Sequence, residues 1–542
     1  MLASEREKMK KTTHTNELWI KCITNAFAIT LLASCGGGGG ASTTGGTTTA
    51  NQSGIPPVTN GFEVWDYNYT PSAGLAGKMC INFSAGSSAA QIGNSRLFIN
   101  GYMEASDLTG TVDATGNVAM STPTFATQFS AIVNAAATLM SGTFTGTGAI
   151  GAGTFTGGRV TGKYSCFWGP FGTGAALDVV ATDKTMTPAI AMDGTNPVVA
   201  FVEAVLGTPV NGSTPFEDRV YVKRWNGTQW MQLGGALNTG LNDLANQPLV
   251  AVANGNPVVT WTERNKTTLV YEAYAKRWDG TTSTWVSLGG LLNNPSTQDT
   301  YAKGVVIDNN DNPVILLTYK TTLPLAIRLD SRAMQWSAAT STWSQLGANL
   351  LDTWVYHVAK DPAGVPVFVA QFGLTVGANK WNSVTSTWDA IGGGIPTSLG
   401  TVMSAEIAYT GSGVPVMVYD TNTGFSTYVG ANTVVNGSWV QLIQGVSFDP
   451  VSSKQAPHIA IDPTDGLPVV AASSNSMGGI VIKKAYATQW KQMGSNFDNY
   501  TLFSSKSPVI AFDSAGKLYA ASSQQPTSSD SNIVLSTWPS QN

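Results

Sequence analysis

Short apolar runs recur from about residue 186 to the C-terminus, and turn residues bound each of them. Each unit opens with an apolar run that ends at a turn, and a run of the Pro-Val-Val type follows. The turn carries an aspartate at Asp193, Asp308, Asp361, Asp462 and Asp513. Apolar runs of this length between turn signals predict short β-strands.

A third run in each unit ends on an aromatic residue in most cases, and a short turn connects it to a Trp-x-x-Leu-Gly segment. This segment starts at Trp230, Trp285 and Trp343, and recurs with a changed apolar residue at Trp388 and Trp490. Trp439 keeps the aromatic residue but lacks the glycine. Four short strands per unit, repeating every roughly 50–60 residues, predict the blades of a β-propeller.

Counting the opening strands gives seven units, of which the second and fifth lack the aspartate. The seventh unit ends at Trp538, which corresponds to a third strand. Residues 176–182 form a spare strand-like segment before the first unit. We expect this segment to supply the missing fourth strand, because an unclosed ring would leave sheet edges open.

Residues 62–170 alternate with period two and repeat Gly-Thr-Phe-Thr-Gly at 142–146 and 153–157. The pattern predicts a small antiparallel β domain, a barrel or a sandwich. A helix over 127–140 is left open. The chain is therefore expected to be all-β, with this domain at 62–170 followed by a seven-bladed β-propeller at 173–542.

The N-terminal segment has the features of a signal peptide. Charged residues precede an apolar run over 22–32, which is too short to cross about 30 Å of hydrocarbon. The run ends in Leu-Ala-Ser-Cys35, which resembles a lipobox. Residues 1–34 are thus predicted to be a lipoprotein signal peptide, with Cys35 lipidated and Met9 as an alternative start.

Residues 35–61 are rich in Gly, Ser and Thr and have nothing to bury, so they are expected to form a flexible tether. The resemblance to bacterial lipoproteins implies a lipid anchor in the outer membrane, with Gly36 compatible with that destination. Whether the protein faces the periplasm or the exterior stays open.

Charged residues make up only 11% of the chain. Without residues 1–34, 24 basic and 30 acidic residues remain, a net charge of −6. Since no basic patch is present, nucleic acid is not expected as a partner. Cys80 and Cys166 are then the remaining thiols in an oxidising compartment, and we expect a disulfide between them rather than a metal site.

The repeats resemble those of kelch-like and BNR-like bacterial propellers. The Gly-Gly pairs at 234–235 and 289–290 follow the fourth strand, unlike those of standard kelch blades, and the Ser-x-Asp-x-Gly box of sialidases is absent. The hairpin from Trp225 to Trp230 is similar to that of small fucose-binding propeller lectins. The Arg and Glu with which those lectins hold the sugar have no repeated counterpart here.

The repeated aspartates and tryptophans are interpreted as turn and packing residues. Candidate binding residues are instead those that vary, on the face formed by the second-to-third and fourth-to-first connections. They are Glu203, Glu263, Arg264, Tyr319, Trp354, His357, Phe372, Tyr419 and Asp420. Glu203 and Glu263 occupy equivalent positions in adjacent units, so paired carboxylates could act on glycosides.

Only His357 and His458 would remain in the mature chain, and His458 is expected to be packed in its strand. A Ser-His-Asp triad is therefore improbable. No catalytic residue, cofactor or metal site is predicted. The favoured function is non-catalytic binding of an envelope protein or a glycan. The alternatives are a lectin-like glycan binder and a glycoside hydrolase or lyase that uses carboxylates on this face.

Overall fold

The computed structural model describes residues 61–70, 76–84, 89–99, 105–113, 115–122, 126–134, 139–146, 152–159, 169–171, 177–180, 183–206, 216–238, 244–293, 295–323, 326–396, 401–422, 427–443, 456–474, 479–486, 489–493, 506–524 and 532–538. The regular elements of these residues are β-strands, which confirms the prediction of an all-β chain. They include no helix with the length and hydropathy of a membrane span. The predicted signal peptide, the predicted tether up to residue 60, Cys35, Cys166 and the side chain of Cys80 lie outside the described part.

Eight strands between residues 61 and 159 form a closed antiparallel barrel, in which β1 pairs with both β2 and β8. The strands are β1 (Gly61–Thr70), β2 (Ala76–Ser84), β3 (Ala89–Ile99), β4 (Ala105–Asp113), β5 (Asn117–Thr122), β6 (Thr127–Val133), β7 (Leu139–Thr145) and β8 (Ala152–Arg159). Alternate positions of β5 and β6 are buried, and Phe129 packs edge-on against Phe155 with ring centroids 5.6 Å apart. The segment left open as a helix is instead β6 and the start of β7.

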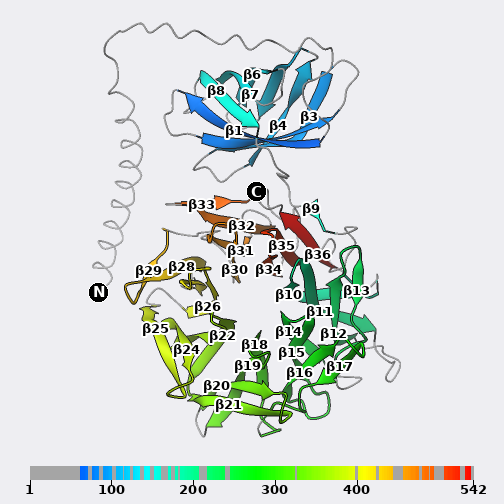
Figure 1. Cartoon of the computed structure of the whole chain (residues 1–542), viewed down its shortest axis with the longest axis vertical. Coiled ribbons are helices and arrows are strands. Elements are labelled where there is room, and N and C mark those ends of the chain that lie inside the picture. The colour runs from blue at the N-terminus through cyan, green and yellow to red at the C-terminus, as the bar shows by residue number, and fades with distance from the viewer. Residues whose placement is uncertain are drawn as a thin grey trace, which may run out of the picture. The chain divides into compact units, whose positions relative to one another are not determined.

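Seven four-stranded antiparallel sheets follow, here called blades 1 to 7 (Figure 1). Blades 1 to 3 comprise β10 (Lys184–Asp193), β11 (Asn196–Leu206), β12 (Phe216–Trp225) and β13 (Trp230–Gln232); β14 (Leu244–Ala253), β15 (Asn256–Arg264), β16 (Tyr271–Asp279) and β17 (Thr284–Ser287); β18 (Thr300–Ile307), β19 (Pro313–Leu323), β20 (Ala326–Ser337) and β21 (Thr342–Leu350).

Blades 4 to 7 comprise β22 (Thr353–Lys360), β23 (Pro366–Phe372), β24 (Thr375–Asn382) and β25 (Thr387–Pro396); β26 (Thr401–Tyr409), β27 (Pro415–Asn422), β28 (Thr427–Val435) and β29 (Ser438–Gln441); β30 (His458–Ile461), β31 (Pro468–Ser474), β32 (Gly479–Tyr486) and β33 (Gln489–Gln492); β34 (Lys506–Phe512), β35 (Leu518–Gln524), β36 (Asn532–Trp538) and β9 (Gly169–Pro170).

The blades form a ring in which the first strand of each blade contacts the first strand of the next, and β34 contacts β10. Apolar cores fill the joints between neighbouring blades. At the joint of blades 7 and 1, for example, Phe201 and Tyr221 pack with Tyr519 and Leu535. The predicted propeller is confirmed by this arrangement, because each blade buries its two faces against its neighbours.

The strand that closes the ring differs from the one predicted. The fourth strand of blade 7 is β9, with Gly169 opposite Thr537 and Pro170 opposite Ser536. Phe171 extends the pairing by donating its backbone N–H to Leu535, and Leu177 donates to Ile533. Closure by residues preceding blade 1 therefore occurs, but the strand lies seven residues earlier than 176–182.

Candidate functional site

The antiparallel order of strands divides the connections of each blade between two faces of the propeller. The first-to-second and third-to-fourth turns lie on one face, here called the turn face. The second-to-third and fourth-to-first connections lie on the opposite face, here called the loop face. Each face presents a different kind of residue.

On the turn face, the repeated aspartates hold the turns. Asp308 Oδ1 accepts hydrogen bonds from the backbone N–H groups of Asn310 and Asn312, both at 2.9 Å, and Gln335 donates to Oδ2 at 2.7 Å. Asp513 accepts from two backbone N–H groups in the same way. The aspartates are thus engaged in turn structure, and the described residues contain no group of His, Cys, Asp and Glu arranged to hold a metal ion.

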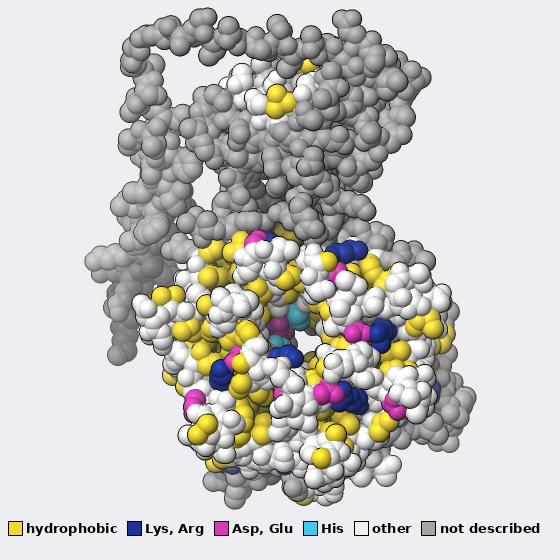
Figure 2. Space-filling view, viewed as in Figure 1, with side chains coloured by type: hydrophobic (Ala, Val, Ile, Leu, Met, Phe, Trp, Pro, Cys, Tyr) yellow, Lys and Arg dark blue, Asp and Glu magenta, His cyan; other side chains and the backbone are white. Residues whose placement is uncertain are grey.

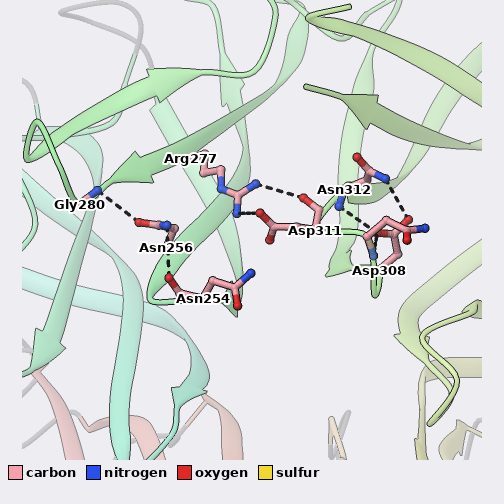
Figure 3. Close-up of polar contacts among 8 residues, drawn as sticks. Asn254, Asn256, Arg277, Gly280, Asp308, Asp311 and Asn312 are labelled. Carbon is pink, nitrogen blue, oxygen red and sulfur yellow. Dashed lines mark hydrogen bonds and ion pairs between the residues drawn. The ribbon is translucent and has the colours of Figure 1, made fainter. Parts of the chain in front are cut away.

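Basic side chains connect neighbouring turns on the same face. Arg277 of blade 2 forms an ion pair with Asp311 of blade 3 and also donates to its carbonyl oxygen at 3.1 Å (Figure 3). Arg224 of blade 1 donates to the carbonyl of Gly255 in blade 2 at 2.9 Å. Figure 2 shows basic and acidic side chains next to one another around the ring of blades.

The Trp-x-x-Leu-Gly segments join successive blades at their outer strands. The indole N–H groups of Trp285, Trp343, Trp388 and Trp439 donate to the carbonyls of Leu233, Leu288, Leu346 and Ile391 in the preceding blade, at 2.6–3.0 Å. The glycine after the apolar residue has a positive φ and leaves room for this ring. At Gly347, a Cβ would lie 3.0 Å from Trp381 and 3.2 Å from Trp388.

The two candidate catalytic carboxylates are buried and engaged. Glu203 accepts hydrogen bonds from the backbone N–H groups of Val179 and Val180 at 2.8 Å or less, and burial raises its pKa. Glu263 accepts from the indole N–H of Trp261 at 2.6 Å. Both side chains are inaccessible to solvent, so neither is placed to take a proton from a ligand.

Four other candidates are buried or partly buried. Asp420 is buried and accepts from the backbone N–H and the hydroxyl of Ser404. Tyr319 is buried beneath the guanidinium of Arg332, 5.2 Å from its ring. Phe372 packs against Phe368, and Tyr419 donates to Asn432.

Two of the three remaining candidates, Arg264 and Trp354, belong to a row of aromatic and basic residues that crosses blades 2, 3 and 4 on the loop face. This row, here called the aromatic–cationic row, consists of Arg264, Tyr271, Tyr301, Lys303 and Trp354. Arg264 lies 5.9 Å from the ring of Tyr271, which lies 5.0 Å from the ring of Tyr301. Lys303 lies between Tyr301 and Trp354, 5.7 and 5.8 Å from their rings.

The row is formed at strand ends. Arg264 ends β15 and lies opposite Tyr271, which starts β16. Tyr301 and Trp354 are the second residues of β18 and β22, and a register shift follows in each strand, between Ala302 and Gly304 and between Val355 and His357. Trp354 is 46% exposed. The sequence analysis did not single out Tyr271, Tyr301 or Lys303. Tyr301 occupies the same strand position as Trp354, and this equivalence is the signal that could have identified it.

Exposed apolar side chains accompany the row on the loop face. They are Leu269, Leu351, Leu374 and Met403. The rings of the row are partly accessible, and burial raises the pKa of Tyr301 to about 12, so its phenol stays neutral. The row can therefore offer ring faces for stacking together with two positive charges.

His357 lies apart from the row, at the central opening of the propeller. It shares one first-strand position with Glu406 and His458 in the next two blades. Each of the three side chains accepts a hydrogen bond from a backbone N–H of the following blade, at 3.2–3.5 Å. Histidine and acidic side chains are visible at the wall of the hollow in Figure 2.

His357, Glu406 and His458 are here called the channel arc, and burial is the main cause of their shifted pKa values. It lowers the pKa of His357 to about 4 and that of His458 to about 3, and raises the pKa of Glu406 to about 8. His458 Nδ1 lies 3.7 Å from Glu406 Oε2. At neutral pH the arc thus consists of neutral imidazoles beside a protonated carboxyl.

Comparisons with known proteins identify no family. No family model matches the chain, and no curated protein matches it. Similar solved structures include a protein of unknown function from Dyadobacter fermentans, with 11% identity, a TM-score of 0.42 and coverage of 67% of this chain and 96% of that one.

Two sialidases are also among the similar structures. The Trypanosoma rangeli sialidase with the inhibitor DANA has 12% identity and a TM-score of 0.39, over 70% of this chain and 59% of its own. The NanB sialidase from Streptococcus pneumoniae has 10% identity and a TM-score of 0.34, over 89% and 95%. Likeness at this level assigns no activity to the chain.

Proposed function

We propose that this chain is an outer-membrane lipoprotein whose seven-bladed propeller, preceded by the small barrel, binds a carbohydrate without catalysis. The observation that carries the proposal is the aromatic–cationic row on the loop face. Partly exposed rings at the ends of strands from three blades form a platform on which the apolar face of a sugar can stack.

Non-catalytic binding is favoured over hydrolysis because the candidate carboxylates are buried and form hydrogen bonds within the protein. Glu203 and Glu263 are buried and hold a backbone segment and an indole N–H, respectively. Glycoside hydrolysis needs a pair of carboxyl groups on either side of the scissile bond. Asp420 is likewise buried and bonded to Ser404.

The test of binding is a glycan array probed with the full-length chain and with Trp354→Ala. The wild-type protein is expected to bind a subset of the glycans, and Trp354→Ala is expected to bind the same glycans at least tenfold more weakly. Leu374→Ala, another exposed apolar side chain on the loop face, serves as the matched control. Equal binding by wild type and Trp354→Ala would overturn the proposed site.

The anchor and the disulfide are tested separately. Cys35→Ser should release the protein from the membrane fraction, because the acyl chains would be absent. A non-reduced digest should yield a peptide pair joined through Cys80 and Cys166. Retention of the Cys35→Ser variant in the membrane fraction would contradict the lipoprotein assignment.

A further inference from the structure

The composition of the aromatic–cationic row points to a class of ligand. Three aromatic rings and two basic side chains follow one another along it, and successive groups lie 5.0–5.9 Å apart. A neutral sugar needs only the rings. A ligand with carboxylates or sulfates along a sugar chain would use both the rings and the charges between them.

We propose that the row binds an acidic polysaccharide, with sugar rings stacked on Tyr301 and Trp354 and anionic groups paired with Arg264 and Lys303. This inference rests on the proposed carbohydrate-binding function. Guanidinium and ammonium groups form short, charge-assisted hydrogen bonds with carboxylates and sulfates.

Two carboxylates beside Tyr271 are engaged by other groups. Asp299 accepts from the backbone N–H of Tyr271 and lies 3.8 Å from Lys320. Glu272 accepts from the hydroxyl of Tyr274 at 2.7 Å and from the side chain of Asn265. These partners reduce the repulsion that an incoming anion would meet beside the two cations of the row.

Arg264 supplies a second, independent observation. Its guanidinium Nε is buried and has no hydrogen-bond acceptor among the described residues, and its guanidinium carbon lies 5.9 Å from the Tyr271 ring. Arg332 has the same unpartnered Nε, but its guanidinium donates to the carbonyl of Leu292 at 2.8 Å, and Arg277 and Arg219 form ion pairs with Asp311 and Glu217. Arg264 is thus positioned by an aromatic ring and lacks an acceptor at Nε.

The net negative charge of the chain limits where an acidic polymer could bind. The chain has a net charge of −4 overall, so a general attraction of the protein for polyanions is excluded as the source of binding. Any affinity for an acidic polymer must come from a local site such as this row.

The experiment compares polygalacturonate with its methyl ester, which has the same backbone without the charges. Titration calorimetry with the full-length chain should show at least tenfold tighter binding of polygalacturonate, and the difference should shrink with added salt. Heparin serves as a sulfated probe and dextran as a neutral one.

Variants separate the two levels of the proposal. Arg264→Gln and Lys303→Gln should each remove most of the preference for the acidic polymer and leave the weaker binding of the ester in place. Trp354→Ala should reduce binding of both. Lys184→Gln, which removes a charge from the start of β10 in blade 1, is the matched control and should change neither.

The outcomes are distinguishable. Equal affinity for polygalacturonate and its ester, sensitive to Trp354→Ala, would overturn the acidic class and keep carbohydrate binding. Binding of acidic polymers that Trp354→Ala and Lys303→Gln leave unchanged would place the site elsewhere and overturn the proposal. No binding of any of the four polymers would overturn both this proposal and the aromatic–cationic row as a carbohydrate site.

Discussion

On the outer strands, Trp285, Trp343, Trp388 and Trp439 each donate an indole N–H to the preceding blade, whereas Trp354 on the loop face is half exposed and lies beside Lys303. The outer tryptophans recur at one position and serve one purpose, which is to join blades. Trp354 occurs once, at a strand end. In a repeat protein, recurrence thus marks residues that build the fold, and departure from the repeat marks candidates for binding.

The largest effect should come from the glycine that makes room for an outer tryptophan. Gly347 has φ +73°, and a Cβ there would lie 3.0 Å from Trp381. Gly347→Val combines backbone strain with overpacking, and we expect it to lower the free energy of unfolding by about 3 kcal/mol or more. Thermal or denaturant unfolding measures this change.

Gly411→Val is the matched control for this variant. Gly411 lies in an exposed turn where an added Cβ would meet no atom within 4 Å, so a loss below about 1 kcal/mol is expected. Similar losses in the two variants would mean that the glycine of the motif is not fixed by its neighbouring tryptophan.

Replacing an outer tryptophan by phenylalanine should have a smaller effect on the free energy of unfolding, and the effect should differ between Trp343 and Trp490. Trp343→Phe removes a 2.7 Å hydrogen bond to the carbonyl of Leu288 and should cost about 1–2 kcal/mol. In blade 6, Trp490 has a buried Nε1 without a partner among the described residues, and Ile443 stands where other blades have the glycine. Trp490→Phe should therefore cost less, and an equal cost would contradict the role of the hydrogen bond.

The strand that closes the ring could have been predicted from the sequence repeat. Trp168-Gly-Pro-Phe-Gly172 matches the Trp-x-x-apolar-Gly pattern, and its central residues are the closing strand β9. The match was missed because the segment precedes the first unit and contains a proline, which argues against a central strand. A proline is tolerated here because β9 is the edge strand of its sheet.

The candidate site could be predicted only in part. The loop face follows from strand order alone, and Arg264 and Trp354 stand at strand ends that sequence inspection could locate. The equivalence of Glu203 and Glu263 was visible as well. The burial of Glu203 was not, because it depends on Val179, which lies in the segment before β10. Contacts between blades require the register, which the pattern does not specify.

Another predicted effect is a pH dependence of stability that comes from Glu406 in the channel arc. Burial raises the pKa of Glu406 to about 8, so its contribution to stability is complete below pH 4.5 and declines as pH rises toward 8. Glu406→Gln should remove this decline, which for these two pKa values amounts to roughly 3 kcal/mol between pH 5 and 8. Unfolding measured across this range in both proteins tests it.

The histidines of the channel arc affect the pH dependence of stability in the opposite direction. Their lowered pKa values mean that stability declines as pH falls through 6.5, where the histidines of the unfolded chain gain their protons. Between pH 7 and 8 they are neutral in the folded state and largely neutral in the unfolded state, so they contribute little to the pH dependence there. A parallel pH dependence of wild type and Glu406→Gln in that window would show that Glu406 does not hold its proton there.

The smallest effect on stability is expected at the loop face. Trp354→Ala should change the free energy of unfolding by less than about 1 kcal/mol, because the side chain is 46% exposed and its indole N–H makes no hydrogen bond to another blade among the described residues. Truncating a packed aromatic side chain costs about 3–5 kcal/mol. Denaturant unfolding of Trp354→Ala and Trp388→Ala measured side by side provides the comparison. A loss of 3 kcal/mol or more in Trp354→Ala would make Trp354 another residue that holds the blades together, and the contrast between the outer strands and the loop face would no longer hold.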